Sequence, residues 1–360
     1  MKIPTSSPVM VTGSTGYVGG VLVQQLLETG LTIHCPVRDS TNESKIQHLK
    51  DLKGGENLKF FDADLLDQGS YLDSMKGCSV VFHVASPFII SVPKGKEQEM
   101  LLDPAIKGTL NVLESARDPV LGSSVKRVVV TSSVAAIASD GTDTEEVVKR
   151  TGAMCNEETW NTSASIDYMP YPYSKTLAEK AAWDFIKEKD CSYDLVVCNP
   201  SFVMGPGVKI HSGESYDFAK NLATGFLKSG APDIGMKVVD VRDVARGHIA
   251  AGFLPSKTVA GQRYILNGTN SNLLDMSKLL LEEYPNLPLP KSIIPKWIFW
   301  LVAPLLGKTR KFVSRSVSHN FEMDNSKSLR DLELGEYRTL KETLVDMYSQ
   351  CIEKGYIPAK

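Results

Sequence analysis

Tyr171 and Lys175 are the residues whose types and spacing predict chemistry most directly. They stand four positions apart in the stretch Tyr-Pro-Tyr-Ser-Lys, at the start of a segment with a helical pattern. Residues i and i+4 lie on one face of a helix, so the Lys175 ammonium would lie beside the Tyr171 hydroxyl and lower its pKa from about 10. Such a phenol can give or take a proton near neutral pH while a hydride moves at a neighbouring carbon.

Polar residues also follow three apolar segments that are typical of strands, in His83–Ser86, Thr131–Ser133 and Asn199–Ser201. Open α/β sheets bind ligands at the carboxyl ends of their strands. There the Ser133 hydroxyl could donate a hydrogen bond to a carbonyl oxygen, which gains negative charge as hydride arrives. We therefore predict a carbonyl-reducing site in which Ser133 joins the tyrosine and the lysine as the catalytic residues.

A glycine-rich stretch, Thr12-Gly-Ser-Thr-Gly-Tyr-Val-Gly19, lies between the first predicted strand and the first predicted helix. Here Gly13 would permit a tight turn, Gly16 a close approach to a pyrophosphate, and Gly19 close packing of the helix on the strand. The pyrophosphate would bind at the helix N-terminus, where free N–H groups and the helix dipole favour anions. The sequence therefore predicts a dinucleotide cofactor in contact with Gly13, Thr15, Gly16, Tyr17, Val18 and Gly19.

The end of the second predicted strand favours NADP(H) over NAD(H). An enzyme that prefers NAD(H) would carry a carboxylate there, whereas this chain has Arg38, whose planar guanidinium suits a 2′-phosphate. Lys45, one turn into the next helix, could add positive charge. The neighbouring Asp39 leaves NAD(H) open as the alternative.

Further cofactor contacts are expected at the carboxyl ends of the other strands. Asp64 and Leu65 follow the third predicted strand, where they would meet the adenine, although Asp64 could equally cap a helix. The remaining expected contacts are Val84, Ala85, Ser86, Thr131, Pro200 and Val203, together with Tyr171 and Lys175.

A parallel sheet would position these residues. In the first half of the chain, short apolar segments alternate with helical patterns, which predicts an α/β fold: a Rossmann-type, doubly wound parallel sheet with helices on both faces. Beyond about residue 200, Gly and Pro become frequent and the alternation loosens. We predict a dinucleotide-binding domain at 1–200, with a strand returning to its sheet near 236–255, and a smaller, mostly helical substrate-binding lobe at 201–360.

The composition narrows the class of protein. The chain has 360 residues, with Lys plus Arg (40) nearly balancing Asp plus Glu (42), so the overall charge indicates neither a nucleic-acid nor an anionic-membrane partner. Its six cysteines are scattered without the spacing of a zinc site or a disulfide framework, and residues 1–8 lack the features of a signal peptide. We expect a cytoplasmic protein without a bound metal that acts on a small molecule, as a monomer or homodimer.

One apolar run, Trp297–Leu306, needs a separate interpretation. It has about half of the ~20 residues of a membrane-spanning helix and contains Pro304, so no integral membrane segment is predicted. A buried or pocket-lining helix is the favoured interpretation. The alternative is a membrane-surface contact, because the basic residues Lys308, Arg310 and Lys311 follow.

These motifs together resemble the extended short-chain dehydrogenase/reductase family, within the NAD-dependent epimerase/dehydratase superfamily. The branch with dihydroflavonol and cinnamoyl-CoA reductases is the most similar. The resemblance implies that Ser133 polarises the carbonyl, Tyr171 is the acid, and Lys175 binds the nicotinamide ribose. It also implies NADPH at Arg38, Pro200 near the nicotinamide, and pro-S hydride transfer. The shared stretches include Val11–Gly19, Val37–Asp39, Val81–Pro87, Val130–Ser133, Tyr171–Trp183, Asn199–Pro200 and Val241–Ala245.

Departures from that branch bear on the substrate. Dihydroflavonol reductases commonly carry Asn or Asp where this chain has Ala138, and the stretch Met169–Lys175 differs from the cinnamoyl-CoA reductase signature. The charged insertion Asp140–Arg150 is expected above the pocket. We predict NADPH-dependent reduction of an aldehyde or ketone. The alternatives are a nucleotide-sugar epimerase or dehydratase, a 3β-hydroxysteroid-type dehydrogenase, and a protein that binds NADPH as a sensor without turnover.

Overall fold

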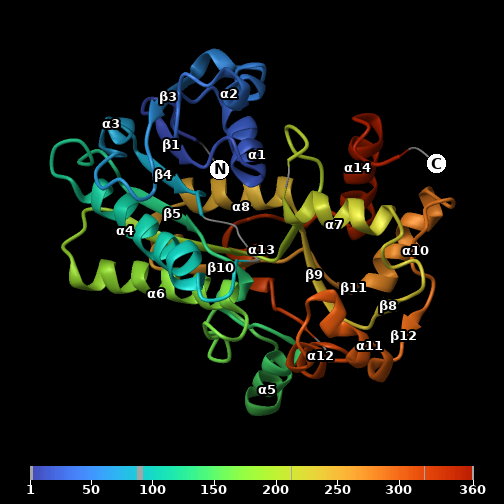
Figure 1. Ribbon diagram of the computed structural model, residues 1–360. Coiled ribbons are helices and arrows are strands. Elements are labelled where there is room, and N and C mark those ends of the chain that lie inside the picture. Colours follow the sequence, from blue (N-terminus) through green and yellow to red (C-terminus); the bar gives the residue numbers. More distant parts are fainter. Residues whose placement is uncertain (1–2, 87–91, 212, 320, 359–360) are drawn as a thin grey trace.

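A seven-stranded, wholly parallel sheet forms the centre of the protein (Figure 1). The computed structural model describes residues 3–86, 92–211, 213–319 and 321–358. The strand order is β10-β6-β5-β4-β1-β2-β3, which is that of a doubly wound fold. The strands are β1 Val9–Thr12, β2 Ile33–Val37, β3 Leu58–Asp62, β4 Val80–His83, β5 Arg127–Thr131, β6 Asp194–Pro200 and β10 Arg263–Leu266.

Helices cover both faces of this sheet, which confirms the predicted Rossmann-type fold. On one face, α1 packs against α8 and α2 lies beside α1; on the other, α4 packs against both α3 and α6. Six of the seven strands are almost entirely buried because apolar side chains enter both layers, whereas the edge strand β3 has no buried residue. The helices are α1 Tyr17–Leu27, α2 Glu43–Lys50, α3 Leu72–Met75, α4 Asp103–Arg117, α6 Pro170–Glu188 and α8 Val241–Phe253.

The strand that returns to the sheet differs from the predicted one. The expected segment near 236–255 contains β9, Gly235–Asp240, which pairs with β7 and β11 in a separate three-stranded sheet. Instead β10 pairs with β6, and because it occupies that edge, β9 cannot join there. The part of 236–255 that does return is α8, which packs on α1. The other two strands of this small sheet are β7 Phe202–Met204 and β11 Thr269–Asn272.

The rest of the chain forms a mostly helical region beside the carboxyl edge of the large sheet (Figure 1). Its core lies between α7, α10 and α14. The inserted segment after Ser139 forms α5, which packs against α12 rather than standing free. The elements are α5 Gly141–Thr151, α7 Glu214–Ala223, β8 Ala231–Pro232, α9 Ser256–Val259, α10 Leu273–Glu283, β12 Ile293–Ile294, α11 Lys296–Val302, α12 Arg310–Ser316, α13 Ser326–Asp331 and α14 Leu340–Glu353.

Candidate active site

The glycine-rich turn between β1 and α1 has the geometry that the sequence predicts. Gly13 has a φ of +67°, and its carbonyl accepts a hydrogen bond from the Gly16 N–H at 2.9 Å. A Cβ at Gly13 would lie 2.9 Å from the Ala85 backbone, and one at Gly19 would lie 2.1 Å from the Gly13 oxygen. Glycine is therefore required at both positions. Because Gly16 caps α1 without a side chain, the first N–H groups of the helix are left for an anion.

The neighbouring residues in this turn differ in their environments. Tyr17 points away from the turn, since its hydroxyl donates to the Gly205 carbonyl at 2.5 Å and its ring meets Tyr216 edge-on. Val18 packs on the hydrophobic core, and Thr15 is half-buried within the turn. The side chains of Tyr17 and Val18 are thus engaged within the protein, which leaves their backbone N–H groups for the expected contacts with a dinucleotide.

Arg38 lies exposed just beyond β2, and no described residue forms an ion pair or hydrogen bond with its guanidinium. Asp39 is not equally available, because its carboxylate accepts hydrogen bonds from the Thr41 hydroxyl and backbone N–H, which lower its pKa. Lys45 is exposed on α2. Lys209, which no sequence pattern places here, lies near Lys45, and burial together with the Lys45 charge lowers the pKa of Lys209. Lys45 and Lys209 thus lie near each other beside α2, and Arg38 is exposed at the end of β2.

The predicted adenine contacts, Asp64 and Leu65, are both engaged within the protein. The Asp64 carboxylate accepts from the Leu66 N–H at 2.9 Å and so stabilises its own turn. Leu65 packs on α4, where its side chain would lie within 3.0 Å of a Cβ at Gly108. The exposed side of Asp64 remains open, whereas the Leu65 side chain is directed into the core.

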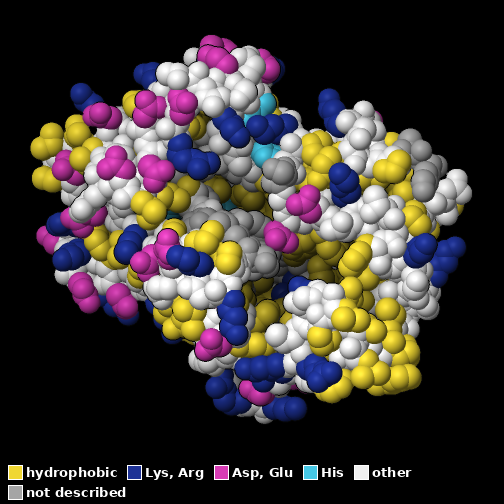
Figure 2. All heavy atoms as spheres, viewed as in Figure 1, with side chains coloured by type: hydrophobic (Ala, Val, Ile, Leu, Met, Phe, Trp, Pro, Cys, Tyr) yellow, Lys and Arg dark blue, Asp and Glu magenta, His cyan; other side chains and the backbone are white. Residues whose placement is uncertain are grey.

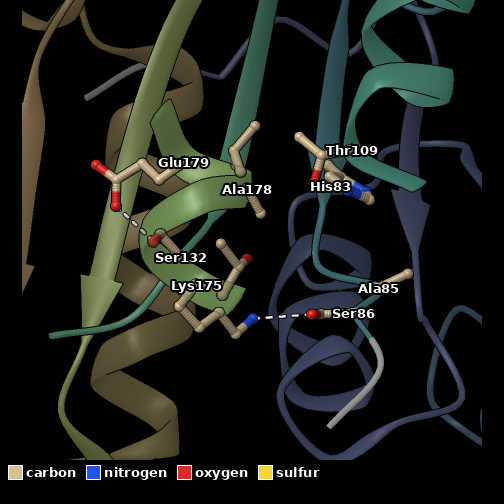
Figure 3. Close-up of a pocket in the computed structure, with 10 residues that line it drawn as sticks. His83, Ala85, Ser86, Thr109, Ser132, Lys175, Ala178 and Glu179 are labelled. Carbon is tan, nitrogen blue, oxygen red and sulfur yellow. Dashed lines mark hydrogen bonds between the residues drawn. The ribbon is translucent and has the colours of Figure 1, made fainter. Parts of the chain in front are cut away.

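The end of β4 meets both the glycine turn and the predicted catalytic lysine. The Thr12 hydroxyl contacts His83 Nδ1 at 3.0 Å and accepts from the Ala85 N–H at 3.0 Å. The Lys175 ammonium donates to the Ser86 hydroxyl at 2.9 Å (Figure 3). Ala85 and Ser86 therefore lie between two parts of the site that are more than 150 residues apart in the chain.

Ser133, Tyr171 and Lys175 lie together at the carboxyl edge of the sheet. A hydrogen bond joins the Tyr171 phenol to Ser133, and the Lys175 Nζ lies 5.8 Å from the centre of the Tyr171 ring. Ser133 lies two residues beyond the end of β5 and caps a short 3-10 helix, Val134–Ala136, where its hydroxyl accepts from the Ala135 N–H at 3.1 Å. The structure thus brings the three residues together, and their catalytic roles stay predictions.

The predicted direction of the Tyr171 pKa is wrong for this structure. Burial raises the pKa of the Tyr171 phenol well above its ordinary value, and the hydrogen bond with Ser133 only partly opposes that effect. Burial also lowers the pKa of Lys175 to about 8, although the nearby Glu179 carboxylate raises it. Desolvation depends on the whole surrounding fold, so the four-residue spacing could not reveal it.

A buried hydrogen-bond network supports these residues, and the sequence did not reveal its centre. Glu179, one turn after Lys175, accepts hydrogen bonds from Ser132, Asn199 and Arg263. Its side chain is fully buried. The network ties α6 to the ends of β5, β6 and β10 and so fixes the height of α6 above the sheet. The sequence signal for Glu179 is its position four residues after Lys175, which places both on one face of α6. An acidic residue at that spacing is also common on the polar face of an amphipathic helix, so the signal was not specific.

The remaining predicted contacts lie at strand ends around the same edge. The Thr131 hydroxyl contacts His248 Nε2 on α8 at 2.8 Å. Pro200 is buried at the end of β6, and the Val203 carbonyl accepts from the Ser215 hydroxyl at 2.6 Å. Val84 is half-buried and packs on the core beside α1. Of these four residues, only Thr131 lines the cavity beside Lys175, and its hydroxyl is engaged with His248.

A small cavity lies beneath the Lys175 side chain (Figure 3). Its free volume of about 10 Å³ suits one water molecule and not a substrate. Its lining includes the ends of β4 and β5 and one face of α6. It is lined by His83, Ala85, Ser86, Thr109, Val130, Thr131, Ser132, Lys175, Ala178 and Glu179.

The inserted helix α5 is attached to the C-terminal region. Asp140, which precedes it, accepts from the Tyr168 hydroxyl at 2.8 Å and pairs with Arg315 at 2.7 Å. Tyr168 is three residues before Tyr171, so the insertion borders the loop that leads into the catalytic helix. Ala138 is buried in a hydrophobic cluster. Within the described ranges, no group of three or more His, Cys, Asp or Glu residues could hold a metal ion.

Comparison with known proteins agrees with this geometry. The NAD dependent epimerase/dehydratase family matches residues 9–266. A cinnamoyl-CoA reductase of Medicago truncatula is 40% identical over 289 residues, which span 79% of this chain and 83% of the relative. An anthocyanidin reductase of Vitis vinifera is 36% identical over 292 residues, which span 78% and 82%.

A solved structure extends the similarity to nearly the whole chain. Yeast methylglyoxal/isovaleraldehyde reductase complexed with NADPH is 28% identical, covers 97% of this chain and 99% of its own, and has a TM-score of 0.73. The protein is therefore an oxidoreductase of the NAD dependent epimerase/dehydratase family, and it belongs to the dihydroflavonol and cinnamoyl-CoA reductase-like branch of the short-chain dehydrogenases/reductases.

Proposed function

We propose that the protein reduces a small aldehyde or ketone to an alcohol, with NADPH as hydride donor and Tyr171 as proton donor. The observation that carries this proposal is the meeting of Ser133, Tyr171 and Lys175 beside the glycine turn of α1. The relatives named as reductases, one of them solved with NADPH, support the same reaction class.

The glycine turn fits a dinucleotide pyrophosphate. A Cβ at Gly13 or Gly19 would collide with backbone atoms, so the close contact between turn, helix and β4 depends on the missing side chains. Arg38 fits the 2′-phosphate of NADPH because its guanidinium is exposed and unpaired among the described residues. Asp39 is bound to Thr41 and so does not compete for the ribose. When bound, the nicotinamide supplies hydride.

The state of Tyr171 suits reduction. Because burial raises its pKa, Tyr171 holds its proton at neutral pH. A carbonyl oxygen that hydrogen-bonds to Ser133 and Tyr171 would take that proton as hydride arrives at its carbon. The carbonyl gains one hydride and one proton, and Tyr171 is left as phenolate, which Ser133 and the nearby Lys175 charge stabilise.

Lys175 and the cavity below it could restore the proton. With a pKa of about 8, Lys175 is mostly protonated at neutral pH but is a stronger acid than an ordinary lysine. Its ammonium donates to Ser86 and borders a space that suits one water molecule. Lys175 therefore both orients the cofactor-facing end of α6 and supplies a route for proton return to Tyr171.

In this proposal, the mostly helical C-terminal region binds the substrate. We assign dinucleotide binding to residues 1–200, whose sheet is completed by β10 and covered in part by α8, and substrate binding to the rest of residues 201–360. We also place the protein in the cytoplasm, which agrees with the finding that all six cysteines are free thiols.

Transfer of deuterium tests this function. The protein is incubated with NADPH that carries deuterium at the pro-S position of C4 and with a panel of aldehydes and ketones. Mass spectrometry should find one deuterium on the carbinol carbon of the product, and pro-R-labelled NADPH should give none. Tight NADPH binding without product from any carbonyl would instead favour a sensing protein and refute the proposal.

A further inference from the structure

An apolar patch is exposed over α11 and the 3-10 helix that follows it, Ala303–Leu306. Trp297 is 67% exposed, Leu301 55% and Leu305 87%. Figure 2 shows apolar side chains gathered on the surface where Figure 1 places α11. A patch of this kind on a single chain usually marks a binding surface. The patch consists of Ile293, Trp297, Trp300, Leu301, Val302, Leu305 and Leu306.

The same segment is already folded on its inner side. Phe299 and Ala303 are buried against Val313 and Val317 of the α12 segment. Because this inner face is packed, the outward side chains are not needed to hold the segment in place. The inner face of the segment is therefore buried, and Trp297, Trp300 and Leu301 line a shallow apolar hollow of about 660 Å³, as the favoured sequence interpretation expects. That interpretation does not account for the exposure of Leu301 and Leu305, which leaves the outer face free to bind a partner.

Positive charge surrounds the patch. Between Glu283 and Glu322 the chain has six Lys or Arg residues and no Asp or Glu, although acids slightly outnumber bases in the whole chain. The Arg310 guanidinium lies 4.3 Å from the centre of the Trp300 ring, at the edge of the patch. Among the described residues, neither Arg310 nor the exposed Lys308 forms an ion pair, although Lys308 lies near enough to Glu214 for its charge to oppose the rise that burial causes in the pKa of that carboxyl. These charges can therefore meet an external anion.

We propose that the apolar patch binds the surface of an anionic phospholipid bilayer. Trp297 and Leu301 enter the boundary between headgroups and acyl chains, where indole rings and aliphatic side chains are favoured. Lys308 and Arg310 reach the phosphate layer beside them. In the described ranges, the chain has no helix of the length and apolarity that crossing a bilayer requires. The segment therefore lies on the membrane and does not span it.

A second copy of the chain is a poorer occupant. A two-fold contact would bring the same patch of both copies together. Lys308 and Arg310 of one copy would then face their equivalents, and the residues from 284 to 321 offer no carboxylate to pair with them. A bilayer with acidic lipids offers the opposite charge and an apolar layer at once.

Sedimentation with sucrose-loaded vesicles tests the proposal. The full chain should bind vesicles of phosphatidylcholine with phosphatidylserine, bind phosphatidylcholine alone much less, and lose binding as salt is added. The Leu301→Ser/Leu305→Ser variant should bind about tenfold more weakly or worse, because two exposed apolar side chains are removed. The matched control Val120→Ser/Val148→Ser, also at exposed apolar positions, should bind like the wild type.

A charge-reversal pair tests the basic rim separately. Lys308→Glu/Arg310→Glu should weaken binding to the phosphatidylserine vesicles about tenfold or more. The control Lys187→Glu/Lys257→Glu changes the net charge by the same amount at exposed positions far from the patch in the sequence, and it should bind nearly normally. Equal losses in both variants would show that overall charge governs binding and would overturn the proposed patch.

Fluorescence quenching locates the contact. Brominated phosphatidylserine should quench the wild-type tryptophan emission, and Trp297→Phe/Trp300→Phe should bind but lose that quenching, since only Trp160 and Trp183 remain. Circular dichroism confirms that each variant is folded. The proposal is wrong if the folded wild type does not bind acidic vesicles. It is also wrong if light scattering shows instead a dimer that the Leu301→Ser/Leu305→Ser variant dissolves.

Discussion

Replacing Lys175 with Met should stabilise the cofactor-free protein while removing its activity. Lys175 is only 7% exposed, and burial lowers its pKa from 10.5 to about 8. At about 1.4 kcal/mol per pKa unit, keeping this lysine charged at neutral pH costs about 3 kcal/mol of folding free energy. The substitution also removes the hydrogen bond from Lys175 to Ser86, which lowers the stability by about 1 kcal/mol. The net gain expected for Lys175→Met is therefore about 2 kcal/mol.

The assay is urea unfolding of the cofactor-free wild type and variants across pH. The pKa of Lys175 is lower in the folded protein than in the unfolded chain, so the unfolded chain binds more protons between about pH 8 and 10.5. The folding free energy that the buried Lys175 charge costs therefore falls as pH rises through that range. The stability difference between Lys175→Met and wild type should shrink over that range. Lys187→Met, an exposed control on the same helix, should change stability by no more than about 0.5 kcal/mol. A Lys175→Met variant less stable than wild type at pH 7 would refute this reasoning.

Two further predictions concern the cofactor site. Arg38→Ala should weaken NADPH binding about 10- to 100-fold and NADH binding little, by fluorescence titration, because only NADPH carries the 2′-phosphate; equal losses would contradict this assignment. Gly19→Ala should abolish dinucleotide binding or folding, whereas Gly20→Ala should be tolerated. The added Cβ would lie 2.1 Å from the Gly13 oxygen in the first variant, but at least 3.6 Å from any neighbour in the second. Thermal shift with and without NADPH distinguishes the two.

Local sequence patterns were sufficient for most of the large sheet. The apolar runs of β1, β4 and β5 are short, lie between helical patterns and are buried on both sides, so composition identifies them directly. The strand β10 was not predicted because its four residues, Arg263–Leu266, lie in the part of the chain where Gly and Pro are frequent and the alternation of strands and helices loosens. The buried Arg263 guanidinium donates to the Glu179 carboxylate and to the carbonyls of Glu157 and Thr159, and the positions of these partners depend on the fold. That pairing is a long-range feature that periodicity does not contain.

The candidate site, like the large sheet, could be predicted only in part from local sequence patterns. The cluster of Ser133 and Tyr171 was predictable because parallel strands bring their carboxyl ends to one edge. The raised pKa of Tyr171 could not be predicted, because desolvation depends on every element packed around the phenol. Lys209 was missed because its loop is distant in sequence from α2, although its side chain lies 3.2 Å from His48 there.

Single-turnover kinetics of Tyr171→Phe test the central claim most directly. The variant keeps the ring and removes only the hydroxyl, so NADPH should bind it as tightly as it binds the wild type. Once a carbonyl substrate has been found, rapid mixing should show that NADPH oxidation in the variant is slower by about a hundredfold or more, the scale of a lost general acid. Unchanged oxidation, with NADPH bound equally well, would show that Tyr171 is not the proton donor.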